Sequence, residues 1–139
     1  MIHVGFWCQR PLPPSLQRLG EEIADLRQLQ SCLWDVLLVT RPLPPRAACA
    51  CRVLLADSAQ AAGCRFVAAE QAVSFGLSRR DSLTLAAMER QRVLCVQRRL
   101  TTLSGRIVEP QELPLPQGTG PQDDLWLLAE AGLTLLLDL

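Results

Sequence analysis

Two stretches of the chain, residues 34–40 and 52–57, carry hydrophobic residues almost without interruption over the length of a strand. A strand buried on both faces of a sheet shows such a run, whereas a strand with one exposed face alternates. We therefore expect both stretches to be central strands. Residues 2–7 form a further apolar run of strand length before a proline-rich turn, and they predict a strand near the start of the chain.

The segment between residues 15 and 33 has a different period. Its apolar positions recur at three- and four-residue spacings: Leu16, Leu19, Ile23, Leu26 and Leu33. This spacing predicts an amphipathic helix with Ser15 as its N-cap. Residues 46–51 are expected to form a turn or two of helix. Strand, helix, strand, short connection and strand in this order indicate a small parallel sheet with right-handed crossovers, a Rossmann-like arrangement.

The second half is predicted to be rich in strands. Short strand candidates lie at residues 71–75, 82–86 and 92–98, with turns at 76–78 and around 89–90. Two more candidates, 100–103 and 107–113, flank a hairpin turn at 104–106.

The chain is expected to close with a helix after a proline- and glycine-rich loop at residues 113–121. Asp123 and Asp124 suit the first turn of that helix because of the helix dipole. The helix is apolar nearly all round, so it should be buried or shared with another subunit. Alternatively, Gly132 ends it and residues 133–137 form a strand. We therefore expect one α/β domain over residues 1–139: a small Rossmann-like parallel sheet, a β-rich segment and an apolar C-terminal helix.

Composition narrows the function classes. The chain has 139 residues, is 49% hydrophobic and 20% charged, and has a formal net charge of zero. It is predicted to be folded, and it lacks the positive field of a nucleic-acid-binding protein. All fourteen basic residues are arginine, and tyrosine is absent, which excludes Schiff-base lysine chemistry and a P-loop lysine.

The hydrophobic stretches predict neither a signal peptide nor a membrane span. Residues 1–8 have no basic segment and no long apolar region. Residues 125–137 include Glu130 and are shorter than the roughly 20 residues that a spanning helix needs. We therefore expect a cytoplasmic protein without a membrane partner.

The six cysteines are expected to be reduced and buried like small hydrophobic residues, because most lie within apolar runs. A metal or redox site at Cys49, Cys51 and Cys64 is the alternative, but one residue between the first two is fewer than structural zinc sites use. We predict no bound metal and no cofactor.

The best candidate ligand residues follow the predicted parallel strands. Ligands in open α/β sheets bind beyond the carboxyl ends of the strands, where this chain has Thr40, Arg41, Asp57 and Ser58. Asp57 is placed like the acidic residue that holds a ribose hydroxyl in dinucleotide-binding folds. However, no glycine-rich phosphate loop follows the first strand, and an aspartate after a strand is commonly a cap or turn residue.

No catalytic group is predicted from the motifs. The single histidine, His3, is expected to be a core or edge residue of the first strand rather than a base. Ser58, Ser74 and Ser78 have no identifiable histidine partner. The arginine pairs of the second half alternate with acidic residues and are expected to form surface ion pairs.

Residues 70–78, with the sequence EQAVSFGLS, resemble a stretch in the central domain of Mur-type ligases, where a strand ends in an aromatic–glycine pair and short strands follow. The loop from Leu115 to Asp124 and the helix after it resemble the segments that close that domain. This chain lacks the family's glycine-lysine-threonine phosphate loop, its carbamate lysine and its His-Asn pair. The resemblance therefore implies a shortened architecture without the ligation machinery, and it transfers no catalytic residue.

The sequence favours a non-catalytic binding or scaffold domain. We expect it to self-associate or to bind a protein partner through the leucine-rich C-terminal helix or a sheet edge. The alternative is a nucleotide- or phosphosugar-binding enzyme with its site at the strand ends near Asp57.

Overall fold

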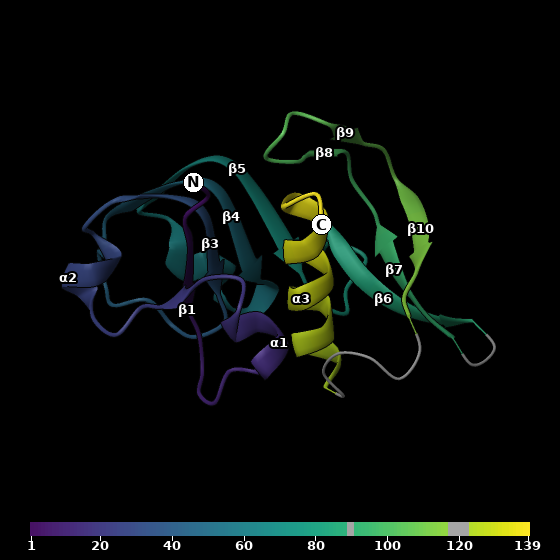
Figure 1. Cartoon of the computed structure of the whole chain (residues 1–139), viewed down its shortest axis with the longest axis horizontal. Helices are drawn as coiled ribbons and strands as arrows, with labels where there is room; N and C mark the ends of the chain where they lie inside the picture. The colour runs from purple at the N-terminus through teal and green to yellow at the C-terminus, as the bar shows by residue number, and fades with distance from the viewer. Residues whose placement is uncertain (89–90, 117–122) are drawn as a thin grey trace.

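The computed structural model describes residues 1–88, 91–116 and 123–139. These residues form an α/β structure with a mostly parallel mixed sheet of eight strands and a C-terminal helix (Figure 1). A two-stranded sheet of β8 (Leu100–Thr101) and β9 (Ile107–Val108) lies apart from this large sheet.

The parallel part of the sheet contains β1 (Val4–Trp7), β3 (Leu33–Val39), β4 (Cys49–Asp57) and β5 (Val67–Phe75). The two-residue β2 (Glu21–Glu22) pairs with β1 in parallel. The strands predicted in the first half are therefore confirmed, and β4 and β5 are longer than predicted. A 3-10 segment, η1, connects β4 to β5 and runs over Ser58–Cys64.

The predicted β-rich segment continues the same sheet in antiparallel pairing. It consists of β6 (Leu83–Met88), β7 (Gln91–Val96) and β10 (Gln111–Pro114). β6 meets the parallel part through one parallel pair, Phe75 with Leu83. The strand order across the large sheet is β10-β7-β6-β5-β4-β3-β1-β2. The hairpin turn predicted at 104–106 is confirmed, with Gly105 at a φ of 91°, a conformation that suits glycine. The predicted turn at 89–90 and most of the loop before the last helix lie outside the described residues.

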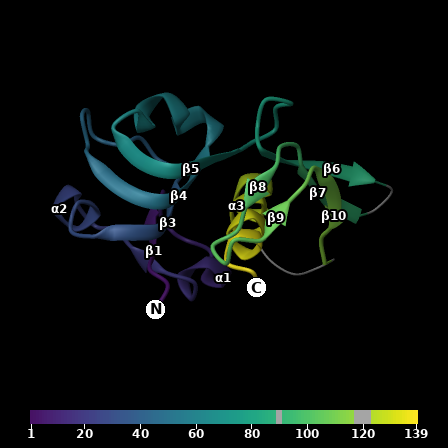
Figure 2. The ribbon, with the colours of Figure 1, turned by 90° about the horizontal axis from the view of Figure 1, so that it is seen from above.

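The C-terminal helix, α3 (Asp124–Leu136), lies between the parallel strands and the antiparallel strands (Figure 2). Asp123 caps it by accepting hydrogen bonds from the backbone N–H groups of Leu125 and Trp126. The helix continues past Gly132, so the alternative of a strand over 133–137 is wrong. Its buried residues are Leu127, Leu128, Ala129, Gly132, Leu133 and Leu136.

Both faces of the central parallel strand β3 are buried over Val36–Val39. In β3, Val36 and Leu38 pack in the core on the α3 side, whereas Leu37 and Val39 pack in the core on the opposite side. All four are fully buried. Because neighbouring residues of a strand point to opposite faces, burial of both faces requires the unbroken apolar run that the sequence shows.

The predicted helix over residues 15–33 is wrong. The structure has two single-turn helices there, α1 (Pro14–Gln17) and α2 (Leu26–Leu29), with β2 between them. A Cβ at Gly20 would lie 2.6 Å from the backbone oxygen of Val4, so the chain passes directly against β1. The backbone N–H of Ile23 then donates to the carbonyl of Phe6. The pairing of residues 21–23 with β1 therefore outweighs the helix-like spacing of apolar residues in this segment.

Two other local predictions also need correction. Ser15 does not cap a helix, because the N-cap of α1 is Pro13, and the Ser15 hydroxyl donates to Glu130 instead. Residues 49–51 belong to β4 rather than to a helix, because Cys49 and Cys51 align with Val67 and Ala69 of β5 in the parallel ladder.

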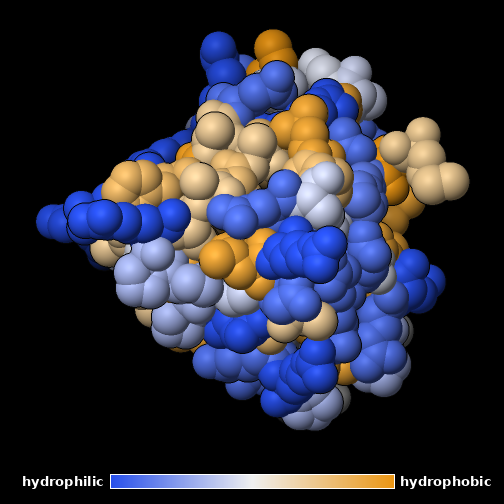
Figure 3. Space-filling view, turned by 90° about the vertical axis from the view of Figure 1, so that its left-hand side faces the viewer, coloured by the Kyte–Doolittle hydropathy of each residue, from blue (hydrophilic) through white to orange (hydrophobic). Residues whose placement is uncertain are grey.

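The two edges of the large sheet are poorly suited to pairing with a second chain. One edge is β2, which has two residues, both of them exposed glutamates. The other is β10, which ends in Pro114 and follows Pro110. Short length, charge and proline each discourage edge-to-edge pairing. On the side of the molecule where α2 lies, hydrophilic and hydrophobic residues are interspersed (Figure 3).

Candidate functional site

The carboxyl ends of the parallel strands bring together two of the four predicted ligand residues. Thr40 follows β3 and Asp57 ends β4, and both line a cavity of about 130 Å³ with Gln9, Asp123 and the first turn of α3. The hydroxyl of Thr40 accepts a hydrogen bond from the backbone N–H of Gln9 at 3.3 Å. The topology therefore places Thr40 and Asp57 at one edge of the sheet, as predicted.

Arg41 and Ser58 do not join that cavity. The guanidinium of Arg41 lies over the ring of Trp7, 3.8 Å from its centroid, and it donates to the carbonyl of Ile23. Trp7 belongs to the core on the face away from α3, so Arg41 is held there by a cation–π contact. Ser58 is exposed at the start of η1.

The carboxylates of this cavity serve as helix caps. Asp57 accepts a hydrogen bond from the backbone N–H of Ala59 at 3.0 Å, and Asp123 caps α3. Two acidic groups disfavour a phosphate ligand, and about 130 Å³ is below the roughly 300–1,000 Å³ of small-molecule sites. The geometry therefore favours structural roles for Asp57 and Asp123.

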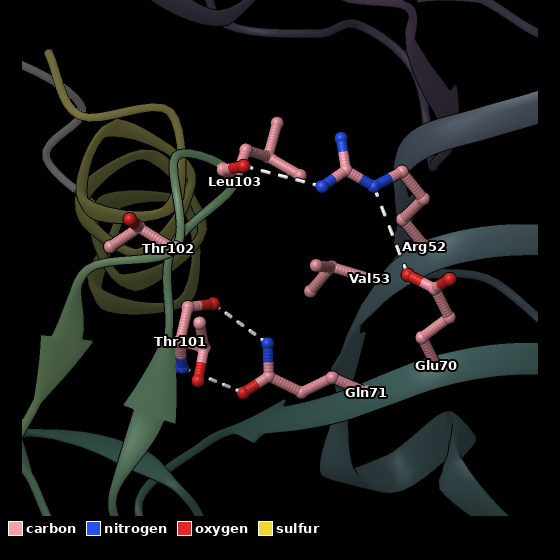
Figure 4. A pocket seen from close by; sticks show the side chains of 8 residues that line it. Arg52, Val53, Glu70, Gln71, Thr101, Thr102 and Leu103 are labelled. Carbon is pink, nitrogen blue, oxygen red and sulfur yellow. Dashed lines mark hydrogen bonds and ion pairs between the residues drawn. The ribbon is translucent and has the colours of Figure 1, made fainter.

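A second cavity, of about 400 Å³, lies between the β8–β9 hairpin and strands β4 and β5. Figure 4 shows Arg52 reaching toward Leu103 and Glu70, with Gln71 facing Thr101. Arg52 also donates to Asp35 at 3.3 Å. Two carboxylates offset its charge, so the arrangement attaches the hairpin to the sheet and does not offer a free cation to an anionic ligand.

The third cavity is a groove of about 560 Å³ between α3, α1 and the strands β7 and β10, which we call the α3 groove. It is lined by Ser15, Arg18, Leu94, Leu113, Pro114, Leu115, Pro116, Leu127, Glu130, Ala131, Thr134, Leu135 and Leu139. Leucine, proline and alanine supply most of this lining. Its size and its mainly apolar walls with a few polar groups are typical of sites for small molecules.

The polar groups of the α3 groove include a connected set from α1 and α3. The Ser15 hydroxyl donates to Glu130 at 2.9 Å, and the Arg18 Nε donates to the carbonyl of Ser15 at 3.3 Å. The Thr134 hydroxyl donates to the carbonyl of Glu130. The groove thus combines apolar walls with one guanidinium and one carboxylate.

All six cysteines are free thiols. Burial raises the pKa of Cys51 to about 12, and neighbouring Cys49 and Cys64 add to that increase. Burial also raises the pKa of Cys49 and Cys64. Within the described residues, no group of three or more potential ligands has a geometry that could hold a metal ion.

Sequence reasoning did not identify the α3 groove. Its walls come from segments far apart in the chain: α1, the end of β10 and one side of α3. The available signal was Leu113-Pro114-Leu115-Pro116, where apolar residues alternate with prolines that limit strand pairing. That pattern predicts a loop from residue 113, whereas the structure places Leu113 and Pro114 at the end of β10.

Comparison of the chain with protein-family models, curated protein sequences and solved structures found no match. Among the residues that the structure describes, no helix has both the length and the apolar content that a bilayer crossing requires.

Proposed function

We propose that this protein is a small binding domain that takes up a mainly apolar molecule with one anionic or polar end in the α3 groove. The observation that carries the proposal is the groove itself, with its volume of about 560 Å³, apolar walls and polar groups of α1 and α3. A ligand there would bury its apolar part against leucines and place its polar end near Arg18.

The size of the cavities favours this site over the strand ends. The α3 groove lies within the usual volume range of small-molecule sites, whereas the cavity beside Asp57 is below it. The α3 groove also contains an exposed arginine, Arg18, whereas the strand-end cavity has two aspartates. These differences support a binding domain more than a nucleotide or phosphosugar enzyme.

We also propose that the architecture is Rossmann-like and related to the central domain of Mur-type ligases. This proposal is supported by the positions of β5, of the antiparallel strands after it and of α3. β5 ends at Phe75 and is followed by Gly76, as the resemblance requires. Short antiparallel strands come next, and α3 closes the chain against the sheet.

We also propose that the protein self-associates, and the burial of the leucines on α3 determines which of them can test this. Leu128 and Leu136 are fully buried within one chain, so an arginine at either position would disrupt the core and would not report on an interface. Leu125 is 40% exposed on α3. If α3 pairs with a second copy, Leu125→Arg should lower the mass in sedimentation equilibrium without lowering stability, and an unchanged mass would exclude that interface.

The binding proposal is tested with anilinonaphthalene sulfonate, an aromatic probe with one anionic group. We expect saturable binding with one site per chain, seen as increased fluorescence. Ala131 lines the groove from α3, and Ala131→Phe should fill the space and weaken binding at least about tenfold.

Ala24→Phe is the matched control, because Ala24 is exposed and lies outside the groove. Urea unfolding of every variant should be cooperative, because a variant with a loosened core would bind the probe without a specific site. Absence of saturable binding, or equal binding by both variants, would overturn the proposal.

A further inference from the structure

The single histidine of the chain lies between a thiol and a carboxylate. His3 Nδ1 is 3.4 Å from Cys32 Sγ, and His3 Nε2 is 2.5 Å from Glu21 Oε1. His3 and Cys32 precede β1 and β3 by one residue, and Glu21 begins β2. Because β3, β1 and β2 are neighbours in the sheet, its amino-terminal edge brings the three side chains together.

The carboxylate of Glu21 determines the tautomer of the imidazole, and therefore which ring nitrogen can accept a hydrogen bond from the thiol. An ionised carboxylate can only accept hydrogen bonds, so His3 Nε2 carries the hydrogen that Glu21 accepts. In the neutral ring, Nδ1 then has a free lone pair, and the thiol of Cys32 can donate to it. This is the order of nucleophile, base and orienting group that activated cysteines use.

The imidazole is also held from its other sides. Its ring packs against Trp34, with centroids 4.4 Å apart and planes at 38°. The backbone N–H of His3 donates to the carboxylate of Asp35 at 2.7 Å, and its carbonyl accepts from the backbone N–H of Asp35 at 2.7 Å. The Trp34 contact orients the ring, and the two hydrogen bonds to Asp35 hold the backbone of His3; none of the three involves Cys32.

The arrangement does not suit a metal ion. Cys32 and Glu21 contact opposite nitrogens of one imidazole, so the three groups cannot bind a single ion together. It suits transfer of a proton from sulfur to the ring.

The other thiols are in less reactive surroundings. Burial raises the pKa of Cys8 and Cys51 to about 12, and it also raises the pKa of Cys49, Cys64 and Cys95. A higher pKa leaves less thiolate, which is the nucleophilic form. Cys32 is partly exposed and lies beside a base.

We propose that Cys32 is a nucleophilic thiol, activated by His3 and positioned by Glu21, that exchanges with low-molecular-weight disulfides such as glutathione disulfide. His3 Nδ1 takes the proton from the thiol, and the sulfur attacks one sulfur of the disulfide. The new bond joins Cys32 to one half of the reagent, and the reagent's own S–S bond breaks. The second half leaves as a thiolate and takes the proton from His3, so one disulfide and one thiol are consumed and one of each is formed.

The test treats the folded, reduced protein with glutathione disulfide near pH 7 and follows each cysteine by peptide mass spectrometry. We expect Cys32 to gain a glutathionyl group at least about tenfold faster than any other cysteine. His3→Gln should reduce that rate to the level of the remaining thiols. Glu21→Gln should reduce it in part, because an amide can also accept from Nε2 but carries no charge.

Glu22→Gln is the matched control, because Glu22 is the adjacent exposed glutamate and pairs with Arg10 at 4.0 Å. It should leave the Cys32 rate unchanged. The rate at Cys95, measured in the same samples, reports any general loosening of the fold. A Cys32 rate no greater than that of the other thiols, or one that His3→Gln leaves unchanged, would overturn the proposal.

Discussion

The side-chain amide of Gln71 forms hydrogen bonds with both backbone polar groups of Thr101. Its Nε2 donates to the carbonyl at 2.8 Å, and its Oε1 accepts from the backbone N–H at 2.9 Å. The amide thus satisfies Thr101 as a neighbouring strand would. Arg52 adds a second attachment by donating to the carbonyl of Leu103 at 3.2 Å. The two side chains hold the β8–β9 hairpin against β4 and β5.

Loss of the Gln71 amide should therefore loosen the hairpin. Gln71→Ala is expected to lower the free energy of unfolding by about 1–2 kcal/mol, because two hydrogen bonds are lost. Urea denaturation measures this change, and hydrogen exchange at the Thr101 amide should become faster. Gln111→Ala is the control, since its side chain donates to the carbonyl of Glu109 two residues away. An equal loss in both variants would contradict this role.

Asp138 connects the end of α3 to the same hairpin. Hydrogen bonds from Ser104 and then Thr102, with a smaller contribution from Arg106, lower the pKa of Asp138 from 3.8 to about 2. A carboxyl with a lowered pKa in the folded state stabilises the fold above its unfolded pKa. That contribution is lost as the pH falls through the folded value.

The contribution of Asp138 should therefore be complete above about pH 4 and should disappear toward pH 2. The comparison is with Asp138→Asn, because asparagine tolerates the positive φ of 59° at this position. We expect the wild-type protein to be more stable than the variant at pH 7. The difference in free energy of unfolding, measured by urea denaturation at each pH, should disappear between pH 4 and pH 2. A gap that is constant over this range would exclude the ionised carboxylate as its cause.

Gly20, in the connection that follows β1, lies directly against that strand. A Cβ there would lie 2.6 Å from the backbone oxygen of Val4, and backbone moves less readily than the end of a side chain. Gly20→Ala should therefore lower the free energy of unfolding by about 1–3 kcal/mol. Gly63→Ala is the control, because a Cβ at Gly63 meets nothing within 4 Å. Thermal unfolding that is equally affected in both variants would contradict the close approach.

The strands were predictable because a strand that is buried on both faces requires an unbroken run of apolar residues in the sequence. Val36 to Val39 are apolar at every position, since alternate residues enter opposite cores. The prediction of a helix over 15–33 was wrong because the same leucine spacing also suits two single-turn helices, α1 and α2, on either side of the paired strand β2. The apolar side chain of Ile23 fits either structure, and the tertiary contacts decide between them: Gly20 lies against Val4, and the backbone N–H of Ile23 donates to Phe6.

The sites were less predictable than the strands because side-chain direction depends on tertiary contacts. The position of Arg41 after β3 was correct, but the Trp7 ring draws its guanidinium to the other face of the sheet. The sequence predicts a core or edge residue at His3, and the structure places it, half-buried, just before β1. Its neighbours Cys32 and Glu21 are 29 and 18 residues away in the chain, so no local motif could reveal them.

Arg18 should determine which end of a ligand the α3 groove prefers. Its guanidinium is exposed at the α1 side of the groove, beside the pair formed by Ser15 and Glu130. We expect Arg18→Gln to weaken binding of anilinonaphthalene sulfonate about fivefold, which corresponds to roughly 1 kcal/mol for a partly solvated charge pair. Titrations at low and high salt should show that the difference shrinks as salt increases. Arg27→Gln, on α2 and outside the groove, should bind the probe like the wild-type protein. Equal weakening by both substitutions would mean that overall charge, rather than Arg18, attracts the anionic end.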